Sequence, residues 1–229
     1  MSWFSTFLKS SIGQKAVMGV TGISLIAFLL VHCGINACIF MNDGGETFNE
    51  AAHFMGSNFF IRVAEIGLFA GILLHIYQGL ALWADKRKRR PVAYDRTAGN
   101  VTSTWYSRSM GLLGTLILLF LILHLAHFWV PSRITGLAEY ALPNGEKRHN
   151  LFAEMQEVFT HLWIVIVYVL GVLSLGYHLL HGFQSAFQSL GMNHPKYTPL
   201  IKAMGYGFSI IIPLIFAAMP IAMYMEWVK

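Results

Sequence analysis

One stretch, residues 61–84, constrains the fold of this chain more than any other feature. It is strongly apolar and ends abruptly in the charged run Asp85-Lys86-Arg87-Lys88-Arg89-Arg90. About 20 apolar residues in a helix cover the roughly 30 Å hydrocarbon core of a bilayer, so this stretch predicts a transmembrane helix. Lys and Arg collect in cytoplasmic loops, so the end of the helix at the charged run is expected to face the cytoplasm.

Composition extends this prediction to the whole chain. Of its 229 residues, 55% are hydrophobic and 12% are charged, whereas a soluble globular domain carries about 25% charged residues. Four more apolar stretches predict four more transmembrane helices, at about residues 15–40, 110–130, 158–187 and 202–227. We therefore expect an all-α integral membrane bundle of five transmembrane helices, which forms a single domain over residues 1–229.

The segments outside the predicted spans differ in character. Residues 46–55 are amphipathic, and we expect them to form a short helix at the membrane surface. Residues 1–14 mix aromatic and polar side chains and predict an interfacial segment. Residues 86–107 and 132–156 are polar and contain turn-forming residues, so both are expected to be loops. Pro131 is expected to close the third span.

The distribution of basic residues predicts the orientation of the chain. With a cytoplasmic N-terminus, the inner side carries Lys9, Lys15, Lys86, Arg87, Lys88, Arg89, Arg90, Arg96, Arg108, Lys196 and Lys202. The outer side then carries Arg62, Arg133, Lys147, Arg148 and Lys229. This bias predicts that the N-terminus lies inside and the C-terminus outside. The net charge of +5 comes from these loops, so no nucleic acid is predicted as a partner.

Histidines are unusually frequent for so apolar a chain. Of the ten in the sequence, six lie well within predicted spans: His32, His75, His124, His127, His178 and His181. An ionisable side chain within a membrane is costly and by default suggests a functional site. Taken singly, any one of them is also explained by a hydrogen bond between neighbouring helices. The set carries more information than its members.

The helical rise sorts these histidines into two tiers. At 1.5 Å per residue, three lie toward the outer ends of their spans and three toward the cytoplasmic ends, in tiers roughly 15 Å apart. The outer tier holds His32 with His124 or His127, and the inner tier holds His75 with His178 or His181. Each tier therefore draws histidines from two different helices.

Two imidazoles on facing helices are typical ligands of a haem iron, with the apolar macrocycle filling the bundle core. A catalytic zinc ion requires three protein ligands and an open position, and neither tier has an acidic residue beside it. A proton relay requires carboxylates interleaved with histidines, and Glu65 is the one acidic residue well inside a span. The two tiers thus predict two bis-histidine haem sites.

Several motifs carry a resemblance to a known family. They are His32-Cys33-Gly34-Ile35-Asn36, Phe48-Asn49-Glu50-Ala51-Ala52-His53-Phe54-Met55, residues 65–75 followed by Tyr77 and Gly79, and Leu170-Gly171-Val172-Leu173-Ser174 followed by Tyr177-His178 and Gly182. In their order and spacing these motifs resemble the five-helix, dihaem cytochrome b membrane subunit of succinate:quinone oxidoreductases. That family comprises the succinate dehydrogenases and quinol:fumarate reductases.

The resemblance implies a set of haem ligands. Carried over to this sequence, His75 and His178 would hold the haem nearer the cytoplasm. His32 would hold the outer haem with a histidine of the third span, where His124 is preferred over His127 because Gly114 precedes it by ten residues. His181 would then be either a partner for a haem propionate or a polar contact at the helix end.

The resemblance also implies a function and partners. The chain would be the membrane anchor and electron-transfer subunit of a succinate dehydrogenase or quinol:fumarate reductase, in a bacterial cytoplasmic membrane. A flavoprotein subunit and an iron–sulfur subunit would dock on its cytoplasmic face, and two haem b groups would pass electrons to or from a quinone, with menaquinone implied for a dihaem member. The basic residues 86–90 would either assist docking or face anionic membrane lipid.

Four polar residues are candidates for the quinone site near the outer haem: Glu50, His53, Arg62 and Glu65. Each also has an ordinary explanation as a side chain on a wet helix face, at the interface or hydrogen-bonded in the bundle. Three other functions remain open: the cytochrome b anchor of a hydrogenase or formate dehydrogenase, a haem-free transporter with a histidine-lined pathway, and an anchor whose haems only hold the bundle together.

Overall fold

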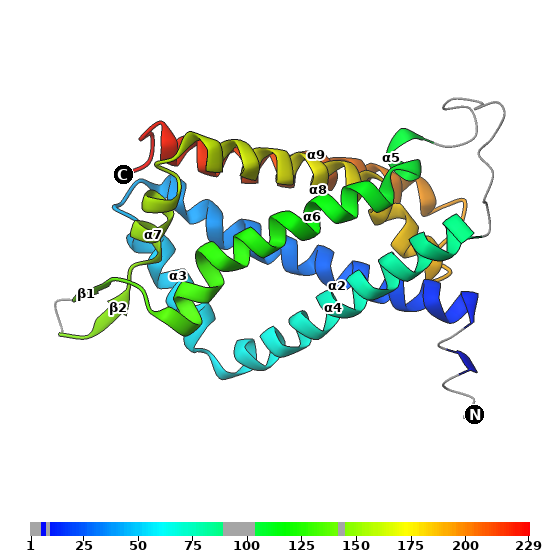
Figure 1. The fold of residues 1–229 in the computed structure, drawn as a ribbon, viewed down its shortest axis with the longest axis horizontal. Helices are drawn as coiled ribbons and strands as arrows, with labels where there is room; N and C mark the ends of the chain where they lie inside the picture. The colour runs from blue at the N-terminus through cyan, green and yellow to red at the C-terminus, as the bar shows by residue number, and fades with distance from the viewer. Residues whose placement is uncertain (1–5, 8–9, 89–103, 142–144) are drawn as a thin grey trace. The chain divides into compact units, whose positions relative to one another are not determined.

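The computed structural model describes residues 6–7, 10–88, 104–141 and 145–229 (Figure 1). In this part of the chain nearly all regular structure is helical, which agrees with the predicted all-α class. Five segments are long and apolar enough to cross a membrane: Ser11–Met41, Phe59–Asp85, Met110–Thr135, Leu162–Ser189 and Thr198–Tyr224. Each has at least 26 residues, which exceeds the roughly 20 that a bilayer core requires.

The helices that form these segments follow the predicted order. They are α2 (Ser11–Ala37) with the 3-10 turn η1 (Cys38–Met41), α4 (Phe59–Lys88), α6 (Met110–His124), α8 (Leu162–Ser189) and α9 (Thr198–Tyr224). Helix α3 (Glu46–Ser57) occupies the segment predicted as a short helix. Pro213 and Pro220 lie inside α9. Such prolines are tolerated in apolar helices where neighbouring helices cover the freed carbonyl groups.

The prediction that Pro131 closes the third span was wrong. After α6, the chain continues as two π-helical segments, η2 (Leu125–Trp129) and η3 (Pro131–Thr135). Pro131 is the first residue of η3 and follows η2 with only Val130, also in helical conformation, between them. Proline therefore begins a helical turn here and does not end one, so Arg133 belongs to the helical segment.

The prediction that residues 132–156 form a loop was also wrong. Strands β1 (Glu139–Ala141) and β2 (Lys147–His149) pair antiparallel, with Tyr140 opposite Arg148. Helix α7 (Leu151–Val158) follows, and a break separates it from α8. The Asn150 side chain caps α7 by accepting a hydrogen bond from the Ala153 N–H at 3.0 Å. Strand β2 consists of polar residues that are mostly exposed, so hydropathy does not distinguish it from a loop.

Two other predictions fall partly on residues that are not described. Most of the predicted loop at residues 86–107 lies outside the described residues, as does half of the predicted interfacial segment at residues 1–14. At the end of that loop, α5 (Trp105–Arg108) forms one helical turn.

The chain divides into two compact units, each of which draws on several helices. Unit 1 consists of Met1–Phe28, Gly67–Leu116 and Ser174–Ile211. Unit 2 consists of Leu29–Ile66, Ile117–Leu173 and Ile212–Lys229. In unit 1, glycines bring α2 against α8: a Cβ atom on Gly19 would lie 3.0 Å from the backbone oxygen of Ala186, and one on Gly22 would lie 3.5 Å from its Cβ.

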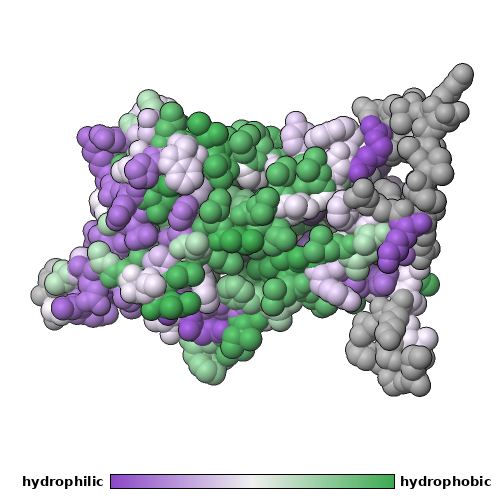
Figure 2. Space-filling model, in the orientation of Figure 1, coloured by the Kyte–Doolittle hydropathy of each residue, from purple (hydrophilic) through white to green (hydrophobic). Residues whose placement is uncertain are grey.

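Many large apolar side chains on the long helices are exposed (Figure 2). Phe60 and Ile66 of α4 are 80% and 72% exposed, and Leu214 of α9 is 64% exposed. Contiguous apolar surface of this kind is rare on soluble monomers and suits contact with lipid. Hydrophilic residues gather instead over the β1–β2 hairpin (Figure 2).

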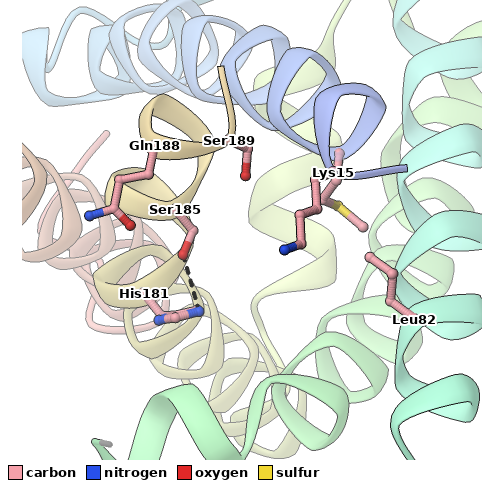
Figure 3. A pocket seen from close by; sticks show the side chains of 7 residues that line it. Lys15, Leu82, His181, Ser185, Gln188 and Ser189 are labelled. Carbon is pink, nitrogen blue, oxygen red and sulfur yellow. Dashed lines mark hydrogen bonds between the residues drawn. The ribbon is translucent and has the colours of Figure 1, made fainter. Parts of the chain in front are cut away.

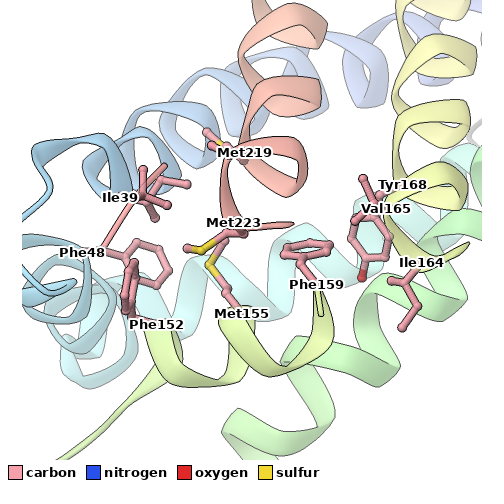
Figure 4. Close-up of a cluster of buried hydrophobic side chains, with 12 residues drawn as sticks. Ile39, Phe48, Phe152, Met155, Phe159, Ile164, Val165, Tyr168, Met219 and Met223 are labelled. Atoms are coloured by element: carbon pink, nitrogen blue, oxygen red, sulfur yellow. The ribbon is translucent and has the colours of Figure 1, made fainter. Parts of the chain in front are cut away.

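The core of unit 2 contains a cluster of buried apolar residues (Figure 4). The cluster consists of Ile39, Phe48, Phe152, Met155, Phe159, Ile164, Val165, Tyr168, Met219, Ala222, Met223 and Val228. Beside it, the buried Asn49 side chain joins α3 to α7: it donates to Asn150 Oδ1 and accepts from the Phe152 N–H, both at 3.0 Å. The short helices of unit 2 are thus fixed by a polar contact within an apolar core.

Replacing Asn49 with leucine is expected to lower the stability of unit 2 by about 1–3 kcal/mol, since the buried Phe152 N–H would lose its partner. Thermal unfolding of the purified protein in detergent measures the change. The matched control is Asn193→Ala, an exposed asparagine, which is expected to change stability by less than about 0.5 kcal/mol. Equal unfolding temperatures for the two variants would show that the Asn49 contact contributes nothing.

Candidate functional site

Unit 1 holds a pair of histidines from different helices. His75 lies on α4 and His178 on α8, and their ring centroids are 6.3 Å apart with an interplanar angle of 64°. Small residues surround them: a Cβ atom on Gly22 would lie 3.9 Å from His75 Cε1, and one on Gly182 would lie 3.8 Å from His178 Cδ2. We call His75 and His178 the unit 1 pair.

Thr21 contacts the His75 ring. The Thr21 hydroxyl lies 2.8 Å from the backbone oxygen of Val17, and its Oγ1 lies 3.1 Å from His75 Nδ1. When the one hydroxyl hydrogen is donated to Val17, the oxygen accepts from Nδ1–H. In that arrangement the Nε2 atom of His75 carries a lone pair, as a metal ligand requires.

Unit 2 holds a second pair, His32 on α2 and His124 on α6, which we call the unit 2 pair. Their ring centroids are 5.7 Å apart with an interplanar angle of 89°. Aromatic rings enclose the pair: Phe216 lies 5.6 Å from His32, and Phe128 lies 5.4 Å from His124. Phe216 and Phe128 therefore give the unit 2 pair an apolar, aromatic border.

Asn36 contacts the His32 ring. Its Nδ2 lies 3.3 Å from His32 Nδ1 and donates to the His32 backbone oxygen at 2.8 Å. An amide that donates to Nδ1 leaves the ring proton on Nε2. Metal binding at His32 Nε2 would therefore require the Asn36 amide to turn its oxygen toward Nδ1.

His127 is engaged elsewhere in unit 2. Its Nδ1 lies 2.9 Å from the Tyr168 hydroxyl, and the two rings stack with centroids 5.8 Å apart and an angle of 11° between them. The ring centroids of His124 and Tyr168 are 6.1 Å apart, and His124 Nδ1 makes no hydrogen bond to Tyr168. The structure thus brings His124 to His32, while the hydrogen bond of His127 goes to Tyr168.

Both pairs have a spacing that suits one metal ion between two imidazoles. A metal–imidazole bond is about 2 Å long and each nitrogen lies roughly 1 Å from its ring centroid, so the centroids of two rings on opposite sides of one ion are about 6 Å apart. The observed 6.3 Å and 5.7 Å agree with this value.

Two buried nitrogen atoms support the same assignment. Among the residues that the structure describes, Nδ1 of His178 and Nδ1 of His124 are buried and have no hydrogen-bond partner. Buried polar atoms are normally paired, so each orphan requires an explanation. One histidine of each pair is thus a ring with unused bonding capacity, and residues of this type fit the iron of a haem. In the same part of the chain, no group of three or more His, Cys, Asp or Glu side chains could hold a metal ion.

Of the quinone-site candidates, Arg62 and Glu65 lie together at the start of α4. Arg62 Nη1 donates to Glu65 Oε2 at 2.7 Å, and the Trp129 indole donates to Glu65 Oε1 at 2.8 Å. Arg133 adds two longer contacts at 3.4 Å, one to each oxygen. The Glu65 carboxylate is therefore held by three side chains, two of which carry a positive charge.

The other two candidates have different surroundings. Glu50 Oε1 lies 3.8 Å from Arg148 Nη1 of β2, and Glu50 is 59% exposed at its side chain. The backbone oxygen of His53 accepts from the Ser57 hydroxyl at 2.8 Å. His181 of α8 lies with its Nε2 3.1 Å from Ser185 Oγ, within unit 1.

Sequence reasoning missed several partners of these residues. Thr21 was visible as a polar side chain within an apolar span, but nothing in the sequence pointed it at His75. Arg133 was missed because the third span was expected to end at Pro131. Trp129 lay within that predicted span, but the π-helical turn that brings its indole to Glu65 carries no sequence signal. Tyr168 carries no sequence signal for its bond to His127, since an aromatic residue in a span is ordinary.

Comparison with protein-family models, with curated proteins and with solved structures finds no match to this chain. A proposal for the function therefore rests on the two histidine pairs and on the sequence motifs.

Proposed function

We propose that this chain is the membrane anchor and electron-transfer subunit of a succinate:quinone oxidoreductase, that is, a succinate dehydrogenase or quinol:fumarate reductase. The observation that carries the proposal is the presence of two histidine pairs, each inside one compact unit and each spaced for one iron. The resemblance of the sequence motifs is the reason for proposing this particular family. Two haem b groups are the proposed cofactors.

In this proposal each residue of a pair has a defined task. His75 and His178 would hold one iron, and His32 and His124 would hold the other. Haem iron, when bound, takes up and releases single electrons. Thr21 keeps the His75 ring in the ligating tautomer. The aromatic rings around the unit 2 pair exclude water, and a dry site influences the redox potential of a bound iron.

The proposed partners follow from the family resemblance. A flavoprotein subunit and an iron–sulfur subunit bind the face where the N-terminus lies, the cytoplasmic face of a bacterial inner membrane. The basic run at residues 86–90, which lies partly outside the described residues, assists docking by charge or contacts anionic lipid. Menaquinone is the proposed quinone, at the opposite side of the membrane.

Glu65 offers the clearest test of the quinone site. Replacing it with glutamine removes the charge that holds Arg62 and Arg133, and we expect quinone turnover of the assembled complex to fall at least tenfold while both haems remain. Glu50→Gln is expected to act in the same direction. The matched control is Glu46→Gln, at the exposed start of α3, which should leave turnover unchanged. Full turnover in both test variants would remove Glu65 and Glu50 from the quinone site.

The function as a whole is tested by a reduced-minus-oxidised difference spectrum of membranes that contain the complex, with succinate as the reductant. The proposal predicts that succinate reduces b-type haem and that the flavoprotein and iron–sulfur subunits co-purify with the chain. Haem that dithionite reduces but succinate does not, together with hydrogenase or formate dehydrogenase subunits in the preparation, would assign the chain to another oxidoreductase. A haem-free transporter shows no haem bands.

A further inference from the structure

Unit 1 contains a pocket of about 440 Å³ (Figure 3). Its lining residues come from α2, α4 and α8, and they are Lys15, Met18, Leu82, His181, Ser185, Gln188 and Ser189. The Lys15 ammonium and the Ser189 hydroxyl point toward the space between them, the Ser185 hydroxyl points toward His181, and the Gln188 amide is turned away from Lys15 (Figure 3). Met18 and Leu82 provide the apolar part of the lining, so the pocket is amphipathic.

The polar lining suits an anion. Lys15 brings an ammonium group with three hydrogen-bond donors, and Ser185, Gln188 and Ser189 bring hydroxyl and amide donors. His181 shares a 3.1 Å hydrogen bond with Ser185. No acidic side chain is among the seven lining residues, all of which the structure describes. Hydrogen bonds from charged donors to an anionic oxygen are about twice as strong as neutral ones.

The pocket lies next to the unit 1 pair. On α8, His181 follows His178 by one helical turn, and on α2, Met18 precedes Thr21, the partner of His75, by one turn. One turn corresponds to about 5 Å along a helix. The close contact of Gly19 with Ala186, between Ser185 and Ser189 in sequence, holds α2 and α8 together beside the pocket.

We propose that this pocket binds an anionic oxygen group, a carboxylate or a phosphate, with Lys15 as its counter-ion and Ser185 and Ser189 as hydrogen-bond donors. Two molecules could bring such a group here. One is the macrocycle held by the unit 1 pair, whose propionate carboxylates lie at its edge, and in this form the inference rests on the proposed function. The other is the phosphate of a phospholipid. The position one turn from the histidines favours the carboxylate.

The test compares Lys15→Gln with Lys202→Gln, an exposed lysine of α9 in the same unit that does not line the pocket. Lys15 is itself exposed, so its replacement is not expected to disturb folding. Potentiometric titration of the purified chain is the first measurement. If a haem carboxylate occupies the pocket, loss of the positive charge favours the oxidised iron, and the ratio of oxidised to reduced haem at a fixed potential rises about three- to tenfold for one haem alone.

The second measurement is native mass spectrometry of the same variants after addition of phosphatidylglycerol or phosphatidylcholine. If a lipid phosphate occupies the pocket, Lys15→Gln retains fewer phosphatidylglycerol molecules than Lys202→Gln, and neither haem potential shifts. Lys15→Arg should restore the normal behaviour in either case. If Lys15→Gln changes neither the haem potentials nor lipid retention, the pocket does not bind an anion. A colourless chain would instead overturn the proposed function, and the lipid measurement would still decide whether the pocket binds a phosphate.

Discussion

Replacing His178 with alanine is expected to remove one of two haems from the purified chain and to leave the other in place. His178 and His75 form one pair in unit 1, whereas His32 and His124 form the other in unit 2. In the proposed arrangement, loss of one imidazole would leave the unit 1 iron with a single protein ligand, while the aromatic surroundings of the unit 2 pair stay unchanged. His124→Ala is expected to remove the haem of the unit 2 pair and to leave that of the unit 1 pair in place.

The measurement is the haem-to-protein ratio by pyridine haemochrome, together with a potentiometric titration that identifies which component is lost. The matched control is His127→Phe, which keeps an aromatic ring beside Tyr168 and should retain both haems. Circular dichroism and gel filtration establish that each variant is folded. The ligand assignment would be wrong if folded His178→Ala retained both haems, or if His127→Phe lost a haem that His124→Ala kept.

Replacing Gly45 with alanine is expected to destabilise unit 2 by about 2–4 kcal/mol. Gly45 has a φ of +79°, in the left-handed region that residues other than glycine rarely adopt. A Cβ atom there would also overlap the Phe152 side chain, which is 3% exposed and belongs to the buried cluster of unit 2. Phe152 cannot retreat without opening that core, so strain and overpacking act together.

The neighbouring glycine separates the two effects. Gly44 has a φ of +72°, but a Cβ atom there would meet nothing within 4 Å, so Gly44→Ala carries the backbone strain alone. We expect it to lower stability by about 1–2 kcal/mol, less than Gly45→Ala does. Thermal or denaturant unfolding in detergent compares the two variants. Equal losses would show that Phe152 accommodates the extra atom without cost.

Helix-level features of this protein can be predicted from the sequence because they depend on length and periodicity. The five membrane-length helices are confirmed, and a short helix is present over the predicted residues 46–55. A rise of 1.5 Å per residue and the chain direction group His75 with His178 or His181, and His32 with His124 or His127. The choice of His178 and His124 within these groups follows from the family resemblance. The haem ligation that this grouping suggests stays a prediction.

Features that depend on how each helix is rotated, and on its exact register, could not be predicted in the same way. The bond from Thr21 to His75 requires two side chains to face each other across α2 and α4, which hydropathy does not specify. The Trp129 and Arg133 contacts to Glu65 depend on the π-helical turns after α6. A wider helical turn rotates all later residues, so a prediction based on regular α-helix places them on the wrong face.

The β1–β2 hairpin shows a different limit. Its strands have three residues each, with alternating exposure and no apolar run, so they carry none of the signals that identify a buried strand. The register from Glu139–His149 to Ala141–Lys147 is observed only in the folded chain.

A redox titration of the purified chain, followed by its visible absorption spectrum, tests the central claim most directly. The account predicts two b-type haems that differ in potential, since the unit 1 pair lies beside Thr21 and a lysine-lined pocket and the unit 2 pair lies among aromatic rings. A folded chain that is colourless, and that binds no haem when haem is supplied, would contradict it.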